Sequence, residues 1–346
     1  MQNKAEIVEK NMRIRFARPE DIPAISKFIY DYWDENYSYA TNIDLLEYIH
    51  KRTQEVWYVV LETEDGSELL GTCGYIVCNQ LEKTDVAVCL LKVKKEVKGL
   101  MGVKMLWFIN QNVPNRFTYN CGLRTNTFGI YQFLQWDVLE LNHYYRIADK
   151  EQYTICKIEN KEIYPVKEEG VELILFESYE QMRQQFKASE FKGMKPYKDE
   201  EYLKWRYFDF PYYKYKIWGV EEEQKVKGLL IGREITYLEA KMLAIVDYIG
   251  EENMFSKLSA SLQKLIEHEN YEYIECFNYG FSVETMKQAG LVIRSEEDNN
   301  ILPSHFEPFE QSNVRDFFFT TNREKLRVFR ADGNHDVPRY VQYIPL

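Results

Sequence analysis

The sequence has no excess of basic residues. It carries 44 lysines and arginines against 55 aspartates and glutamates, a formal net charge of −11 and a pI near 5.2. Proteins that bind nucleic acid through its phosphates present a basic face. We therefore expect no nucleic-acid partner, and an anionic ligand would need a local cluster of cations.

Long apolar runs, secretion signals and paired cysteines are missing too. The most apolar stretch, residues 99–109, is too short to span a bilayer, and the first ten residues are polar and acidic, unlike a signal peptide. The six cysteines form no C-x-x-C pair and stand mostly in apolar, strand-like runs. We expect buried, reduced thiols, a cytoplasmic location and no association with membranes.

Three catalytic signatures are absent. The chain contains no G-x-x-x-x-G-K-[ST], no G-x-S-x-G and no H-E-x-x-H. These absences exclude phosphate-loop NTPases, α/β-type serine hydrolases and zinc proteases. What is present is a globular composition, 45% apolar and 29% charged, over 346 residues, the length of about two domains.

The predicted elements occur in the same order twice. Each half starts with a strand and two helical stretches, continues with a hairpin, a strand and an apolar helix, and ends strand–helix–strand. Pairs that share a period of about 155 residues are Ile14 and Leu173, Val88 and Val246, and Asp137 and Gly290. We expect domains at 1–160 and 168–346, joined by the charged linker Glu159–Gly170. The alternative is chance agreement between two generic α/β halves.

Hydrophobic periodicity predicts the strands and helices that carry the candidate residues. The predicted strands are 86–93, 117–121, 144–158, 243–249 and 271–277. The predicted helices are 99–110, 128–135, 256–268 and 283–289. The fold class that this order predicts is α/β, with a mixed sheet in each half.

One segment of the first half has the features of a phosphate site. Lys94, Lys98 and Lys104 belong to a lysine-rich run in a chain that is acidic overall, and Gly99 and Gly102 mark the start of an apolar helix. Free N–H groups at a helix start, with cations nearby, suit a pyrophosphate. We expect a nucleotide diphosphate to bind here. The alternative is a solvated, lysine-rich helix end.

Two lone carboxylates are candidates for acid–base catalysis. Asp85 precedes the predicted strand 86–93, where the alternative is a turn residue at a strand end. Asp247 stands inside the apolar run LAIVDYIG, and a carboxylate in such a strand needs a partner. Asp247 either pairs with a core cation such as Arg206 or Arg233, or faces a ligand cleft.

The tail is the densest polar segment. Asp332, Asn334, His335 and Asp336 surround Gly333. A histidine flanked by carboxylates suits the role of a base, and these groups also match the hydroxyl and amine groups of a sugar. We expect His335 to be catalytic; the alternative is a polar turn. No cluster has the spacing of metal ligands, so we expect no metal.

This order of elements resembles the GNAT superfamily of acyl-CoA N-acyltransferases. The opening IRFARPEDIPAISKFI is similar to the first strand and helix of that family. The segment NTFGIYQFLQWDV resembles its motif N-x-x-A-I-x-x-Y-x-x-x-G-F, with Asn126 on the asparagine, Phe133 on the tyrosine and Asp137 on the glycine. In the second half Met286 and Gly290 take the last two of these places. The resemblance implies two tandem GNAT-like domains.

The resemblance also implies acetyl-CoA or another acyl-CoA as co-substrate. In the family, a loop Q/R-x-x-G-x-G/A holds the pyrophosphate, and a backbone N–H on the preceding strand stabilises the oxyanion. The cofactor-binding residues so implied are Leu91, Val93, Lys94, Lys98, Gly99, Gly102, Val103, Lys104 and Asn126. The matching segment of the second half, IGEENMFSKLSAS, has acids and no glycine pair, so we expect only the first half to bind the cofactor.

Acyl transfer to an amine or hydroxyl group is the activity implied. The tail, with YLKWRYFDFPYYKY and IVDYIG, is similar to tandem GNAT-like proteins of bacterial surface-polysaccharide gene sets. That likeness implies a small-molecule acceptor, such as an amino sugar or nucleotide sugar. The residues expected to bind it are Arg206, Tyr248, Asp332 and Asp336. The alternatives are an inactive binding or scaffold protein, and an aminoacyl-tRNA-dependent transferase, which the net charge disfavours.

Overall fold

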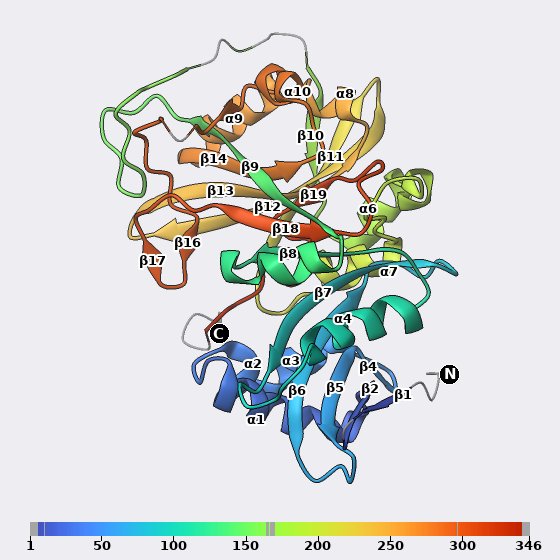
Figure 1. Ribbon diagram of the computed structural model, residues 1–346. Helices are drawn as coiled ribbons and strands as arrows, with labels where there is room; N and C mark the ends of the chain where they lie inside the picture. Colours follow the sequence, from blue (N-terminus) through green and yellow to red (C-terminus); the bar gives the residue numbers. More distant parts are fainter. Residues whose placement is uncertain (1–5, 10, 164–165, 167–169, 296, 341–346) are drawn as a thin grey trace. The chain divides into compact units, whose positions relative to one another are not determined.

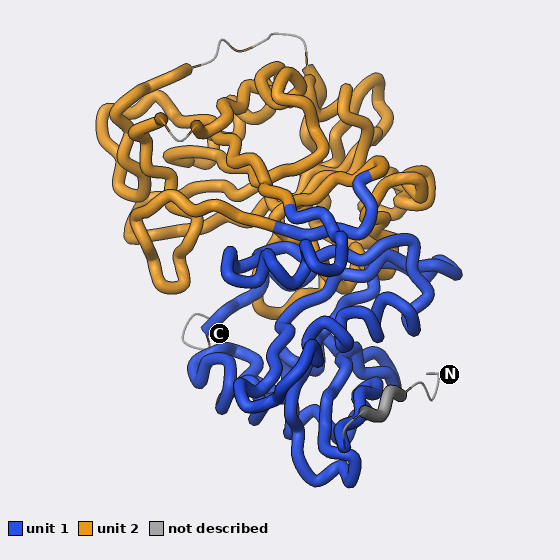
Figure 2. The backbone as a smooth tube through the Cα atoms, in the orientation of Figure 1, with its two compact units in different colours: residues 1–138, 318–323, 333–346 blue, residues 139–317, 324–332 orange. Residues whose placement is uncertain are grey.

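The computed structural model describes residues 6–9, 11–163, 166, 170–295 and 297–340. Five residues of the expected linker, 164–165 and 167–169, lie outside this description. The chain forms two compact units (Figure 2). The first unit comprises residues 1–138, 318–323 and 333–346, and the second comprises residues 139–317 and 324–332. The expected boundaries at 160 and 168 stay a prediction.

The first unit is built on a mixed sheet (Figure 1) with the strand order β1-β2-β5-β6-β7-β8-β18. Neighbours from β1 to β7 are antiparallel, and β7 and β8 run parallel. The strands are β1 (Glu6–Glu9), β2 (Met12–Phe16), β5 (Tyr58–Thr63), β6 (Leu69–Val77), β7 (Thr84–Val93), β8 (Asn115–Leu123) and β18 (Asp316–Thr320). A separate ladder joins β3 (Lys51–Arg52) and β4 (Glu55–Val56).

Helices cover both faces of this sheet. They are α1 (Ile22–Tyr32), α2 (Ser38–Thr41), α3 (Ile43–His50), α4 (Met101–Asn112) and α5 (Phe128–Phe133). Side chains alternate along a strand, so neighbours in β5 meet different helices. Tyr58 packs its ring on His50 of α3, whereas Val59 and Leu61 join the core under α4.

The second unit repeats this plan with the order β9-β14-β13-β12-β11-β10. Here β13 and β14 are the parallel pair. The strands are β9 (Asp137–Ile147), β10 (Glu172–Leu175), β11 (Tyr215–Glu222), β12 (Lys225–Tyr237), β13 (Ala240–Gly250) and β14 (Tyr271–Tyr279), with the short β15 (Val292–Ile293) and β19 (Val328–Phe329) added to β9 and β14. The helices are α6 (Tyr179–Gln185), α7 (Glu200–Leu203), α8 (Glu252–Phe255), α9 (Ser259–Glu269) and α10 (Val283–Gln288).

A β-bulge recurs at the same place in both units. In β7, Val86 and Val88 face the core under α4, the register shifts, and Leu91 and Val93 then face that core. In β13, Leu243 and Ile245 face the core under α9, and after the shift Tyr248 does so. One extra residue reverses the alternation of side chains. The two bulges therefore occupy equivalent positions about 157 residues apart.

Two sequence predictions about the strands and helices need correction. The strand predicted over 144–158 ends at Ile147. Beyond it, the N–H groups of Thr154 and Ile155 bind the carboxylate of Glu272 instead of a neighbouring strand. The helix predicted over 256–268 begins at Ser259, because a separate turn, α8, precedes it.

The cysteine prediction is confirmed: all six thiols are free and buried. Among the described residues, no helix has the length and apolar character needed to cross a lipid bilayer.

A buried ion cluster fixes the returning tail to β13. The bulge turns Asp247 away from the α9 core, where Lys198 Nζ lies 2.6 Å from both of its carboxylate oxygens. The same ammonium lies 3.0 Å from Asp332, and Tyr207 OH donates to Asp247 at 2.5 Å. Burial, with the nearby Asp247, raises the pKa of Asp332 to about 6 against the pull of Lys198. One cation therefore holds two acids from distant parts of the chain.

Replacing Lys198 by methionine leaves two carboxylates buried without their cation. Breaking a buried ion pair costs about 3–5 kcal/mol, so we expect K198M to lower the free energy of unfolding by that amount. Lys204→Met is the matched control, because its partner Asp209 is exposed and surface pairs contribute roughly 1 kcal/mol or less. Urea denaturation measures both variants, and equal midpoints for the two would contradict the role of this cluster.

Candidate active site

The parallel strands β7 and β8 separate at one end. Their ladder stops at Ala87 and Tyr119. At the next step the Asn120 side-chain amide donates to the Val88 carbonyl oxygen at 2.5 Å, so a side chain stands where a backbone bond would continue the ladder. A side-chain bridge spans a wider gap than a backbone pair. The strands therefore diverge toward their carboxyl ends, the edge where α/β sheets bind ligands.

The bulge of β7 lies at this opening. Leu90 has a φ of 49°, in the left-handed region, and Leu91 and Val93 follow it. A bulge leaves one residue's backbone groups outside the ladder. The start of α4 lies over the same place, since a methyl group added to Gly102 would lie 3.7 Å from both Leu91 and Val93. The structure thus brings together these three predicted cofactor residues.

The turn between β7 and α4 is open. Gly99 has a φ of 90°, and an added Cβ would meet no atom within 4 Å. No side chain caps α4, and its first N–H groups have no acceptor within the helix. Val103 and Lys104 follow on the first turn of α4, both partly exposed. This turn has the backbone donors that a phosphate group requires.

The lysines of the segment differ in what they can do. Lys94 is 6% exposed; its ammonium lies 2.6 Å from Glu68 Oε1 and 4.7 Å from the Tyr32 ring centroid. Burial lowers the pKa of Lys94, but Glu68 and Tyr32 raise it by more, so it stays above its ordinary value. Lys98 is exposed beside Gly99 and pairs with no acid that the structure describes. Lys98 is therefore better placed than Lys94 for an incoming anion.

The end of α5 corrects the alignment with the family motif. Gln135 has a φ of 58° at the end of α5, as Gly290 has a φ of 77° at the end of α10. Four residues before these left-handed positions stand Tyr131 and Met286, both buried. Placing Phe133 on the motif's tyrosine was wrong by two residues, because the sequence carries glutamine where the motif has glycine.

The corrected alignment therefore puts Tyr131, which the sequence had indicated as a poor replacement on a different helix face, at the tyrosine position of the motif. Its ring stacks on Phe319 with centroids 4.3 Å apart, whereas Phe133 is 64% exposed. Burial raises the pKa of Tyr131 well above its ordinary value. Asn126 is exposed in the single turn before α5. The left-handed φ of Gln135 indicates how this segment aligns with the family motif, but no sequence pattern predicts that conformation.

The predicted base Asp85 is fully buried at the closed end of the β7–β8 pair. Arg116 binds both of its carboxylate oxygens, at 2.7 Å from Nε to Oδ1 and by a second bond from Nη2, and Asn79 donates to it at 3.1 Å. This arrangement joins the two strands where they are closest.

The tail lines the opening of the first unit. An added Cβ at Gly333 would lie 3.1 Å from the Ala87 side chain, and one at Gly122 would lie 2.5 Å from His335 Nδ1. Tyr39 OH donates to Asn334, and Ser38 donates through its backbone and its hydroxyl to the carbonyls of residues 339 and 338. Asp336 is buried. Of the predicted tail residues, His335 therefore lies at this opening, beside Gly122 of β8.

In the second unit the corresponding opening is filled. The strand β19 pairs with β14 through Asn278–Phe329 and Tyr279–Val328. Ala331 N donates to the Val246 carbonyl at 2.9 Å, and Arg327 donates to the Gly250 carbonyl at 2.7 Å. The tail thus takes up backbone groups of β13 at and beyond its bulge.

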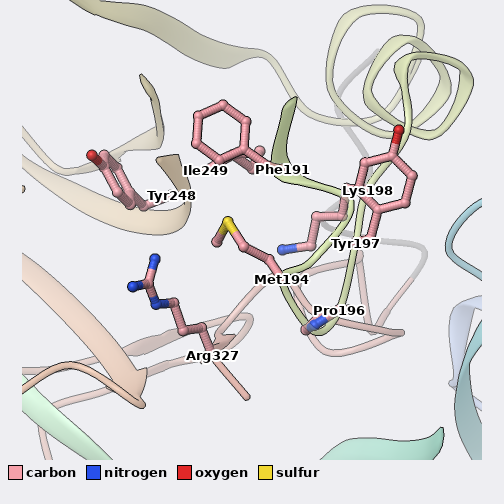
Figure 3. Close-up of a pocket in the computed structure, with 8 residues that line it drawn as sticks. All are labelled: Phe191, Met194, Pro196, Tyr197, Lys198, Tyr248, Ile249 and Arg327. Atoms are coloured by element: carbon pink, nitrogen blue, oxygen red, sulfur yellow. The ribbon is translucent and has the colours of Figure 1, made fainter. Parts of the chain in front are cut away.

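A small pocket and a larger cavity remain near the end of β13. Figure 3 shows Met194, Lys198 and Arg327 gathered with Tyr248 around a pocket of about 10 Å³, roughly the room for one water molecule. A cavity of about 440 Å³ lies beside it, bordered by Glu190, Glu251, Gly280 and the tail residues 325–327.

The predicted acceptor residues of this unit are core groups. Asp332 and Asp247 belong to the cluster around Lys198; the expected partners Arg206 and Arg233 were wrong. Arg206 is 1% exposed, donates to Tyr215 OH at 2.8 Å and lies against the Phe210 ring. Tyr248 donates to the Glu251 carbonyl at 3.0 Å.

Neither a family model nor a curated protein matches the sequence. Solved structures do resemble it. A GCN5-related N-acetyltransferase from Anabaena variabilis has a TM-score of 0.56 and 11% identity, with 89% of this chain and 72% of that chain covered. A probable N-acyltransferase from Enterococcus faecalis has a TM-score of 0.55 and 9% identity, with 89% and 71% covered. The chain therefore has the mixed α/β fold of the GCN5-related N-acetyltransferases, as the resemblance implied.

Proposed function

We propose that this protein transfers an acyl group from acetyl-CoA or another acyl-CoA to an amine or hydroxyl acceptor. The observation that carries the proposal is the opening between β7 and β8, with its bulge at Leu90, beside the uncapped start of α4. At the bulge, backbone groups of β7 lie outside the β-ladder and could bind a thioester. The turn at Gly99 has N–H groups that could bind a pyrophosphate.

The backbone of β7 would supply the oxyanion donor. The tetrahedral intermediate of acyl transfer carries a negative oxygen that needs a fixed N–H donor. We assign this role to Leu91, which follows the bulge and lies under the start of α4. Lys98, Gly99, Gly102, Val103, Lys104 and Asn126 would surround the phosphates and the entrance.

Tyr131 is the candidate proton donor for the leaving thiolate. It takes the tyrosine position of the family motif once the motif is aligned on Gln135. Its phenol, whose pKa burial raises above an ordinary value already well over 7, is protonated at neutral pH, as a proton donor must be. Asp85, held by Arg116, would support the strand pair and leave proton transfer to other groups.

The second unit would not bind acyl-CoA. Its bulge is already bonded to Ala331, and β19 lies along β14. We propose one cofactor site in the chain, in the first unit. The acceptor we propose is a small hydroxyl-rich amine such as an amino sugar, in keeping with the polar tail residues, of which His335 lies against Gly122 of β8.

Reversal of charge at Lys98 tests the phosphate site. We expect K98E to raise the Kd for acetyl-CoA about tenfold or more, roughly 1.4 kcal/mol, because a carboxylate would face the pyrophosphate. Isothermal titration calorimetry measures this Kd. The control is Lys83→Glu, the same change on an exposed lysine just before the opposite end of β7. Equal loss in both variants, or no binding to the unsubstituted protein at millimolar acetyl-CoA, would rule the site out.

Removal of the Tyr131 hydroxyl tests the proton donor. We expect Y131F to lower kcat about 10²-fold, since a positioned acid contributes on that order, with an unchanged Kd for acetyl-CoA. Release of CoA in the presence of glucosamine reports kcat. Tyr30→Phe, on an exposed position of α1, is the control. An unchanged rate in Y131F would assign the proton to another donor.

A further inference from the structure

The last described residues of the chain form one wall of the β7–β8 opening. Gly333 packs on Ala87 at the point where the ladder stops. Further along, Asn334 is bound by Tyr39, and residues 338 and 339 accept bonds from Ser38 at 2.5 and 2.7 Å. These bonds give a terminal segment the fixed geometry that a catalytic group needs.

His335 lies inside this fixed segment, directly against β8. Gly122 has a φ of 85°, and its missing Cβ is the space that the imidazole occupies, with Nδ1 on the β8 side. The ring is partly exposed, unlike its neighbour Asp336. A side chain at Gly122 would displace the ring, so strand and tail fit each other here.

Three other described titratable groups of the first unit, Asp85, His50 and Cys89, are poorly suited to take a proton. Asp85 is bound by Arg116 and fully buried. His50 is buried between Tyr39 and Tyr58, and burial lowers its pKa to about 3. Burial also raises the pKa of the Cys89 thiol, 3.9 Å from His50 Nε2, so this pair stays neutral.

We propose that His335 is the general base of the transferase, delivered to the first unit by the C-terminal tail. This rests on the proposed function. The imidazole, through Nε2, takes the proton that the acceptor amine loses as its nitrogen bonds to the thioester carbonyl carbon. The C–S bond then breaks, and the CoA thiolate leaves with a proton from Tyr131. The products are the amide and free CoA. The proton on His335 passes to solvent and Tyr131 regains a proton from solvent, which returns both groups to their starting states.

The test compares acetyl-CoA binding with turnover in His335→Gln. Turnover is the release of CoA with glucosamine and a panel of primary amines. We expect H335Q to bind acetyl-CoA with an unchanged Kd and to lose about 10²-fold or more in kcat. The control is His268→Gln, on an exposed residue of the last turn of α9. In His335→Ala, free imidazole is expected to restore part of the rate, which a purely structural role would not allow.

Gly122→Ala provides a second, independent variant. The added methyl group would overlap His335 Nδ1, so we expect kcat to fall with acetyl-CoA binding retained. H335Q at the unsubstituted rate, or H335A with no rescue by imidazole, would overturn the role of His335 while leaving the acyl-CoA site intact. Failure of the unsubstituted protein to bind acetyl-CoA, or to release CoA with any amine, would overturn the transferase and this proposal together.

Discussion

Lys198 holds the architecture of the tail together. Its ammonium joins Asp247 of β13 to Asp332, two acids that are 85 positions apart in the sequence and fully buried. A charge buried at this depth is tolerated only when it is paired and hydrogen-bonded. Removing any one of these three groups would therefore leave a buried charge without one of its partners. Asp332 also accepts the Phe329 N–H at 2.7 Å, which shapes the turn after β19. The cluster thus sets where β19 ends and where the segment that carries His335 begins.

The β-bulge is present in both units, but it has different surroundings in each. In both units an extra residue reverses the strand's alternation and leaves backbone groups at the open end of a parallel pair. In the second unit Ala331 binds the bulge, and the reversed alternation gives Asp247 its buried place beside Lys198. In the first unit the same position is Leu90, an apolar residue that needs no such partner, and the bulge is left beside the start of α4. The residue at this position is thus an acid paired with Lys198 in the second unit and an apolar residue in the first.

The sequence was sufficient for the order of elements because that order depends on local periodicity. Strands β7, β13 and β14 and helices α4, α5 and α10 were found close to their observed bounds, since each has a clear apolar pattern. The details of the site depend on features that periodicity does not carry. The partner of Asp247 is a lysine 49 positions earlier, and no spacing rule connects them. The motif frame depended on Gln135, whose left-handed conformation is uncommon for a residue with a Cβ. Lys94 looked like a phosphate ligand in the sequence, but Glu68, just before β6, pairs with its ammonium.

The two units differ in the hydrogen-bond partners of their strands at the point where the parallel ladder ends. Burying an unpaired N–H or carbonyl costs about 1–3 kcal/mol, so a splayed strand edge must find partners. In the second unit, Ala331 and Arg327 of the tail donate to the carbonyls of Val246 and Gly250. The strand β19 is also paired with β14. In the first unit the Asn120 amide donates to the Val88 carbonyl, where the ladder between β7 and β8 stops. Under the proposed function, a ligand with amide groups of its own would bind the backbone of β7 beyond this point.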